Sequence, residues 1–97
     1  MNTDRSDHLT REELEVYWMP YTGNRLMKDN PRMIVGADGC YYLSADGRRI
    51  FDSLSGLWCC SMGHNRREIA IAVTSQIATL DYSPAFQFGH PQAFQLA

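Results

Sequence analysis

The tripeptide Ala-Asp-Gly occurs twice in quick succession, at 37–39 and 45–47, and this repeat is the strongest constraint on the fold. Asp-Gly favours a tight hairpin, because type I′ turns need positive φ and glycine adopts positive φ at low cost. Short runs rich in β-branched and aromatic residues flank both turns. We therefore predict a small antiparallel meander with strands at Met33–Val35, Cys40–Leu43 and Arg49–Asp52.

A helix is predicted before the meander. Thr10 is a candidate N-cap, and Glu13, three residues later, completes a capping-box pattern. Pro20 is expected to stop this helix, because proline lacks the amide that continues the hydrogen-bond ladder. The segment 19–32 contains two prolines and a glycine, and we predict that it is an extended arm.

A second helix is predicted to follow residue 64. Asn65 is its candidate N-cap, and Glu68 is the partner in a second capping box. Four apolar residues then recur at helical spacing, with Ala72 beside them: Ile69, Val73, Ile77 and Leu80. Pro91 suits the first turn of a further helix. The sequence ends inside an apolar pattern, which favours its interpretation as the beginning of a longer protein.

Composition excludes several classes of function. Nine Lys and Arg against eleven Asp and Glu give a formal net charge of -2, without a basic stripe, so no nucleic-acid partner is expected. The N-terminus carries charges where a secretory signal needs an apolar run, and no uncharged helical run approaches the roughly 20 residues that span a bilayer. Three cysteines, an odd number, argue against a disulfide framework. We expect a cytoplasmic protein with reduced thiols and no membrane contact.

Residues that could carry chemistry have simpler structural explanations. Cys59 and Cys60 are adjacent and lack the spacing of a zinc site, so no metal is expected, and buried packing is the default for free cysteines. His64 is explained as a residue that bonds to backbone at a turn. Lys28 is the only lysine, and a solvated surface role is expected for it in a polar, turn-rich segment. No catalytic residue is assigned to this chain.

The segment SLSGLWCCSMGHN, residues 53–65, places a tryptophan between two glycines. Aromatic residues also occur in two other loops rich in glycine and proline, and the set comprises Tyr21, Trp58, Phe86 and Phe88. A single loop aromatic usually closes a hydrophobic core. Several aromatics on separate loops are what an apolar substrate pocket would use. The residue types alone leave both interpretations open.

Three segments resemble the N-terminal part of class III aminotransferases: YWMPYTGNR, GCYYLSADGRRIFDSLSGLWCCSMGHNRREI and QIATLDYSPAFQFGHPQAFQLA. They are most similar to the omega-amino acid:pyruvate group, which includes beta-alanine:pyruvate transaminases, and the resemblance runs from about Val16 to Ala97. It implies an α/β parent enzyme of fold type I that depends on pyridoxal phosphate. Such an enzyme is several times longer than this chain and works as a homodimer, or higher homo-oligomer, with active sites at the interface.

The resemblance implies an α+β fragment in three parts. Residues 1–32 would form an N-terminal helix and arm, residues 33–65 a meander and pocket loop of the minor domain, and residues 66–97 a helix and loop that lead into the large domain. The parent would move an amino group between an omega-amino acid or amine and pyruvate, and its cofactor would cycle between pyridoxal phosphate and pyridoxamine phosphate. The alternatives are a non-catalytic truncated remnant and another class III enzyme, such as a decarboxylase, racemase or aminomutase.

The resemblance also implies a substrate-binding role for four residues. Leu57 and Trp58 would line the pocket from the family's GLW loop, Tyr21 would close it from the arm, and Phe86 would come from a loop that family dimers share across the interface. Glycines would flank Trp58 because the backbone must turn sharply to aim an indole into a cavity.

The family's catalytic and cofactor-binding residues have no counterpart in this chain. The catalytic lysine, the acid that pairs with the pyridine nitrogen, the aromatic that stacks on the ring and the main phosphate-binding turn all follow Ala97. We therefore expect no cofactor-binding residue here and no activity of the chain alone. The family often has a single cysteine after LW, where this chain has Cys59 and Cys60, and the packing of Cys60 is left open.

Overall fold

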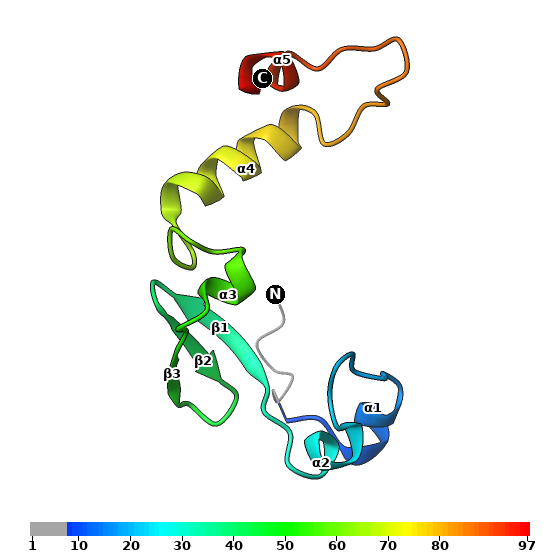
Figure 1. Cartoon of the computed structure of the whole chain (residues 1–97), viewed down its shortest axis with the longest axis vertical. Helices are drawn as coiled ribbons and strands as arrows, with labels where there is room; N and C mark the ends of the chain where they lie inside the picture. Colours follow the sequence, from blue (N-terminus) through cyan, green and yellow to red (C-terminus); the bar gives the residue numbers. More distant parts are fainter. Residues whose placement is uncertain (1–7) are drawn as a thin grey trace. The chain divides into compact units, whose positions relative to one another are not determined.

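The computed structural model describes residues 8–97, which divide after His64 into two compact units. The described part of the first unit has a three-stranded sheet and short helices, and the second unit has two helices (Figure 1). The expected division into parts 1–32, 33–65 and 66–97 stays a prediction.

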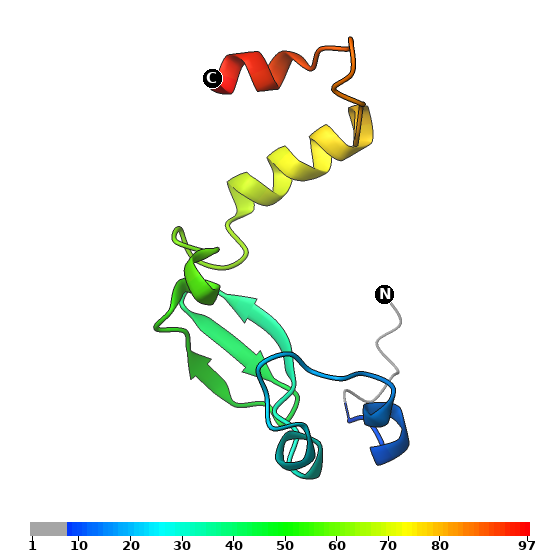
Figure 2. The same cartoon turned by 45° about the vertical axis from the view of Figure 1, so that its right-hand side comes forward.

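The first unit is built on the antiparallel meander expected from the sequence, which is confirmed. Strand β1 covers Ile34–Asp38, β2 covers Tyr41–Ser44 and β3 covers Arg49–Phe51, in the order β1-β2-β3. Both neighbouring pairs are antiparallel, and Figure 2 shows the three strands side by side.

The first hairpin turn differs from the type I′ geometry that we expected. Asp38 still pairs with Tyr41, so Gly39 and Cys40 are the two turn residues. Of these two, Gly39 alone has a positive φ, of 57°. A positive φ at the first central position only is the pattern of a type II′ turn, which requires glycine there.

The second hairpin turn is also not of type I′. The amide of Gly47 donates to the carbonyl of Ser44 (2.9 Å), and Gly47 has a φ of 82°, whereas Asp46 has no positive φ. A type I turn followed by a left-handed glycine is a common three-residue hairpin loop. In both turns only the glycine has a positive φ, because a residue with a side chain pays a steric cost there.

Side chains alternate across the sheet, so one face is covered and the other is open. The buried or half-buried residues of β2 and β3 are Tyr42, Ser44 and Ile50. On the open face, the rings of Tyr41 and Phe51 meet edge to face with centroids 5.6 Å apart, and Arg49 lies 4.2 Å over the Tyr41 ring. One covered face is typical of antiparallel sheets. His64 contributes to the cover, with its ring 4.7 Å from that of Tyr42.

Helix α1, Arg11–Glu15, begins with the predicted capping box. The Thr10 hydroxyl accepts from the Glu13 amide (3.3 Å), and the Glu13 carboxylate accepts from the Thr10 amide (2.8 Å). Val16 is the C-cap, so the helix ends well before Pro20.

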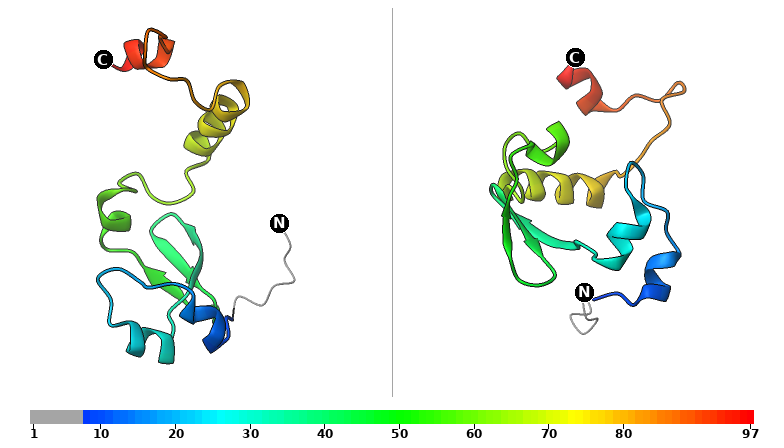
Figure 3. Two further views of the ribbon diagram at one scale, coloured as in Figure 1. Left: turned by 90° about the vertical axis from the view of Figure 1, so that its right-hand side faces the viewer. Right: turned by 60° about the horizontal axis from the view of Figure 1, so that its bottom comes forward.

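The segment expected to be an extended arm contains helix α2, Asn24–Asp29, so that expectation was wrong. The Asn24 side chain orders the preceding loop: its Oδ1 accepts from the Met19 amide (2.8 Å), and its Nδ2 donates to the carbonyls of Met19 (2.9 Å) and Thr22 (3.1 Å). Residues with good helix propensity then follow. Helices α1 and α2 pack together, as Figure 3 shows.

Lys28 is buried, which corrects the solvated role expected for it. Its side chain is 5% exposed, and its Nζ lies 3.6 Å from the Glu15 carboxylate and 5.9 Å from the centroid of the Trp18 ring. Sequence reasoning missed the burial because it comes from the packing of α2 on α1. The ion pair and the aromatic face offset part of the cost of removing the ammonium from water.

The second unit contains helix α4, Arg67–Thr79, and helix α5, Pro91–Leu96. The N-cap of α4 is Arg66 and not the expected Asn65, because Asn65 has a φ of 53°, outside the extended geometry of a cap. Helix α5 begins at Pro91, as predicted.

The Gln76 side chain joins the two helices of the second unit. Its Nε2 donates to the Leu80 carbonyl at the end of α4 (2.9 Å), and its Oε1 accepts from Nε2 of Gln92 in α5 (2.9 Å). His90 caps α5, because its ring nitrogen accepts from the Gln92 amide (3.2 Å).

The apolar stripe predicted on α4 is present and open to solvent in this chain. At least half of each side chain is exposed for Ile69, Val73 and Ile77. Across residues 8–97, no helix has the length and apolar character needed to cross a bilayer.

Candidate functional site: the left-handed turn at residues 55–58

The segment around the predicted pocket tryptophan is a left-handed turn. Element α3, Ser55–Trp58, was expected to be loop, and its four residues have φ values of 51°, 59°, 58° and 71°. Left-handed helical geometry costs about 1–2 kcal/mol for each residue with a side chain. Such strain persists only where surrounding contacts enforce it, and it concentrates at functional sites.

Gly56 is needed in this turn for two reasons. Its φ of 59° favours glycine, and a Cβ atom there would lie 3.2 Å from Sγ of Cys60 and 3.6 Å from Cε1 of His64. The half-buried Cys60 therefore packs against the backbone of Gly56, which answers the question that the sequence left open. Cys40 and Cys59 are exposed, so burial was wrongly expected for them.

Asp52 accepts hydrogen bonds from the backbone that leads into the turn. Its Oδ1 accepts from the Leu54 amide (3.0 Å), and its Oδ2 accepts from the Gly56 amide (2.7 Å). Within the turn, the Trp58 amide donates to the Leu54 carbonyl (3.0 Å). The Asp52 carboxylate thus satisfies amides that this geometry leaves without backbone partners.

His64 is the side-chain partner of Asp52. Its Nε2 lies 2.6 Å from Oδ2 of Asp52, and the two side chains are 12% and 5% exposed. An ionised carboxylate only accepts hydrogen bonds, so Nε2 is the protonated nitrogen. The His64 backbone pairs with Gly39 through hydrogen bonds of 2.7 and 3.1 Å, whereas the His64 side chain bonds to Asp52 and not to backbone as expected.

These contacts determine the charge at the site. The hydrogen bond from His64 is the main cause that holds the pKa of Asp52 below its ordinary value, against the opposing effect of burial, and the amides of Leu54 and Gly56 and the Tyr42 hydroxyl add to it. Burial, and then hydrogen bonding to Asp52, raises the pKa of Tyr42. At neutral pH the site therefore holds a carboxylate and a neutral phenol.

Sequence reasoning missed Asp52 and the side-chain role of His64. An aspartate that accepts from the amides two and four residues ahead is a known turn device, so the spacing from Asp52 to Gly56 was an available signal. The pairing of Asp52 with His64 had no local signal, because it depends on the path of the backbone between them.

The structure places the four expected substrate-binding residues on three segments. Leu57 and Trp58 share the left-handed turn, with 66% and 85% of their surface exposed, and Tyr21 lies in the α1–α2 loop of the same unit, also exposed. Phe86 belongs to the second unit and is 85% exposed. The structure brings together Leu57 and Trp58, and their common pocket with Tyr21 and Phe86 stays a prediction.

Backbone strain coincides with these residues. Six non-glycine residues of the described chain have positive φ, and three of them are the expected pocket residues Tyr21, Leu57 and Trp58. A fourth, Gln87, follows Phe86 directly, with a φ of 65°. Because strained backbone concentrates at binding sites, this coincidence favours a functional role for the three segments over a role in closing a core.

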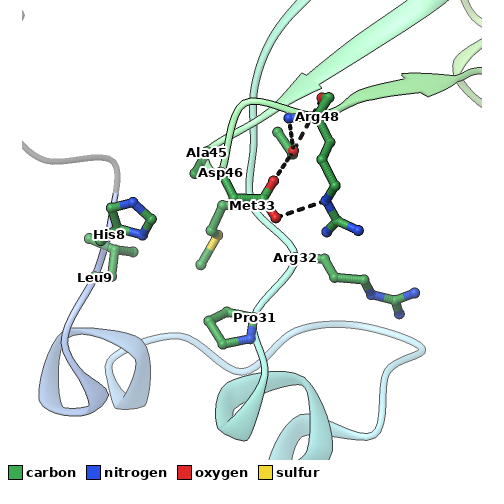
Figure 4. A pocket seen from close by; sticks show the side chains of 9 residues that line it. His8, Leu9, Pro31, Arg32, Met33, Ala45, Asp46 and Arg48 are labelled. Carbon is green, nitrogen blue, oxygen red and sulfur yellow. Dashed lines mark hydrogen bonds and ion pairs between the residues drawn. The ribbon is translucent and has the colours of Figure 1, made fainter.

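A hollow on the first unit is lined by none of these expected pocket residues (Figure 4). It lies between Leu9, the segment Pro31–Met33 and the second hairpin. Three of its polar side chains interact: the Ser44 hydroxyl donates to Asp46, and Nε of Arg48 lies 2.8 Å from the Asp46 carboxylate. This network is explained by the hairpin turn alone.

The residues that the structure describes offer neither a cluster of metal ligands nor an accessible lysine. Residues 8–97 contain no cluster of three His, Cys, Asp or Glu side chains that could hold a metal ion. Lys28, the chain's single lysine, is covered and paired with Glu15, so it is not available to bind a carbonyl group.

Similar proteins of known activity match most of the chain. The omega-amino acid--pyruvate aminotransferase of Pseudomonas putida is 55% identical over 85 residues, which are 88% of this chain and 19% of that protein. The beta-alanine--pyruvate aminotransferase of Pseudomonas aeruginosa is 54% identical over 84 residues, 87% of this chain and 19% of that protein. No protein-family model matches the chain.

Solved structures share the fold. An omega transaminase from Pseudomonas jessenii in complex with PMP has a TM-score of 0.83 and 25% identity over 93% of this chain and 20% of that chain. An (S)-enantioselective omega-transaminase from Thermomicrobium roseum has a TM-score of 0.79 and 28% identity over 88% of this chain and 20% of that chain.

The chain therefore has the fold of the corresponding segment of these transaminase structures. More particularly, it is homologous to the N-terminal part of class III aminotransferases of the omega-amino acid:pyruvate group, so the resemblance found in the sequence is confirmed. The chain spans about a fifth of the length of the relatives that it matches.

Proposed function

We propose that the complete protein is a transaminase that moves an amino group between an omega-amino acid or amine, such as beta-alanine, and pyruvate. The observation that carries the proposal is 54–55% identity, over most of this chain, to two proteins named for these substrates. Pyridoxal phosphate would supply the carrier for the amino group and would be held by residues outside this chain. The similarity to a structure in complex with PMP supports that cofactor.

In this proposal the chain contributes part of the substrate pocket. Leu57 and Trp58 would form a wall, Tyr21 would close the pocket, and Phe86 would line it from a loop that family dimers can share across the interface. Support comes from the high exposure of all four side chains and from the left-handed backbone at Tyr21, Leu57 and Trp58. Exposed apolar side chains on strained backbone are expected where a ligand or another part of the protein covers them.

We also propose that the complete protein is a cytoplasmic homodimer or higher homo-oligomer. All three cysteines are unpaired, which fits a reducing compartment. The open apolar stripe on α4 fits a chain whose apolar surface is covered by further protein.

The test is an assay of the complete product of the gene that encodes this chain, supplied with pyridoxal phosphate, beta-alanine and pyruvate. Formation of alanine supports the proposal, and the 97-residue chain assayed in parallel should be inactive. Decarboxylation, racemisation or an internal amino shift without transfer to pyruvate would identify another class III activity. A gene product that binds no cofactor would identify a non-catalytic remnant.

A further inference from the structure

The left-handed turn is connected to the sheet through two side chains. Asp52 follows β3 directly, and His64 is bridged to Gly39 at the β1–β2 turn, so both are fixed by backbone pairing of the sheet. Between them lie the residues with unfavourable φ, Ser55, Leu57 and Trp58. The Asp52 carboxylate is the point where the amides of the turn and the His64 ring converge.

We propose that Asp52 and His64 form a positioning pair that holds residues 55–58 in the left-handed turn and so fixes the direction in which Leu57 and Trp58 project. Neither residue is proposed to contact substrate. The inference rests on the proposed function only in assigning Leu57 and Trp58 to the substrate pocket. The substrate property that the pair controls is the size of the amino donor that fits beside the indole.

The hydrogen-bond arrangement requires a carboxylate at residue 52. Oδ1 accepts one amide hydrogen, and Oδ2 accepts both the Gly56 amide and Nε2 of His64. An asparagine has one accepting oxygen and one NH₂ group, so in either orientation its NH₂ group opposes at least one of these donors. A buried donor that loses its acceptor is costly, and release of the strained turn removes that cost.

His64 contributes one further donor and a packed ring. Its hydrogen bond to Oδ2 orients the carboxylate toward Gly56, while its ring lies against Tyr42 on the covered face of the sheet. The titratable groups that face the pair are Tyr42 and Cys60. The two contributions of His64 can be separated, because phenylalanine keeps the ring and glutamine keeps a donor.

The experiment uses the complete gene product labelled with 5-fluorotryptophan and observed by ¹⁹F NMR. The resonance of Trp58 is assigned by its loss in Trp58→Phe. In Asp52→Asn and His64→Phe we expect the Trp58 resonance to shift and broaden as the turn opens. In His64→Gln the resonance should keep its wild-type position. Asp46→Asn is the matched control, because Asp46 is also a hydrogen-bonded aspartate of this unit and its partners Ser44 and Arg48 belong to the second hairpin.

The second measurement is the kcat/KM ratio for beta-alanine against a bulky aryl-alkyl amine. We expect this ratio to change about tenfold or more in Asp52→Asn and His64→Phe, and to stay within about twofold in His64→Gln and Asp46→Asn, because one pocket contact discriminates substrates by roughly 10- to 200-fold. A shifted Trp58 resonance in a protein without transamination would uphold the pair and reject the proposed function.

Two outcomes would overturn the inference. One is an unchanged Trp58 resonance in Asp52→Asn. The other is loss of the sheet together with the turn, seen as loss of slowly exchanging amides in β1–β3, because the pair would then support the whole unit and not the turn. A Trp58 resonance that moves equally in Asp46→Asn would also overturn the inference, because the effect would then not be specific to the turn.

Discussion

Gly39 and His64 pair through two backbone hydrogen bonds, of 2.7 and 3.1 Å, although 24 residues lie between them in the sequence. The bridge joins the first hairpin turn to the residues that follow the left-handed turn, so backbone pairing connects the sheet to the segment that contains this turn. Gly63 makes the close approach possible, with a φ of 93° and a would-be Cβ 3.4 Å from the Gly39 carbonyl oxygen.

The first prediction concerns this bridge. Gly63→Ala should lower the free energy of unfolding of the complete protein by about 1–2 kcal/mol, because alanine is strained at positive φ and its methyl group crowds Gly39. Gly36→Ala is the control, since Gly36 has no positive φ and a Cβ there would meet Leu43 at an ordinary 3.6 Å. Denaturant unfolding of both variants checks the prediction, and equal effects would contradict it.

The second prediction is a pH dependence. The lowered pKa of Asp52 contributes stability that is present above the ordinary aspartate pKa of about 3.9 and is lost as pH falls below it, through the folded-state pKa. Asp52→Asn should therefore reduce the slope of stability against pH between about pH 5 and pH 3. Some slope should remain, because the pKa of Asp46 is also lowered, chiefly by the hydrogen bond from Ser44. An unchanged slope would show that the Asp52 contacts do not stabilise the fold.

The features predicted correctly from the sequence are those set by neighbouring residues. Gly39 and Gly47 determine the hairpins through their own φ, and Thr10 and Glu13 form a capping box within one helical turn. The exact turn types were missed, because they depend on which strand residues pair and not on the Asp-Gly sequence.

The features missed depend on contacts between distant segments. Burial of Lys28 follows from the packing of two short helices, and the left-handed turn follows from a carboxylate and an imidazole on either side of it. Trp58 could be recognised as unusual from its flanking glycines, but the positive φ of Ser55, Leu57 and Trp58 contradicts their local preferences. Only tertiary contacts produce such geometry.

The third prediction is that Lys28 forms no stoichiometric adduct with pyridoxal phosphate. Its ammonium is paired with Glu15 and covered by Trp18, and its side chain is 5% exposed. The 97-residue chain is incubated with pyridoxal phosphate, reduced with borohydride and mapped by mass spectrometry. A stoichiometric, site-specific label on Lys28 would contradict the prediction.

The fourth prediction is that the 97-residue chain on its own is at most marginally folded. Leu14, at 8% exposure, is the one buried apolar residue among residues 8–97, whereas Ile69, Val73 and Ile77 of α4 are at least half exposed. Because burial of apolar surface is the main stabilising contribution, a chain with so little of it should show a broad, low-temperature transition and self-association. A sharp two-state melt of a monomer, by calorimetry and sedimentation, would contradict this.

The fifth prediction tests Trp58 as a pocket wall in the complete protein. The ring is 85% exposed on a strained turn, so Trp58→Ala should leave thermal stability and cofactor binding nearly unchanged. It should shift kcat/KM between small and bulky amino donors by about 10- to 200-fold, the range for one wall contact. Trp18→Ala is the control, because Trp18 is similarly exposed, at 78%, but lies by Lys28 and should leave donor preference unchanged.

A core tryptophan would behave differently: its truncation costs roughly 3–5 kcal/mol of stability and spares the donor ranking. Thermal melts and donor profiles of both variants, measured on the same preparations, distinguish the two roles.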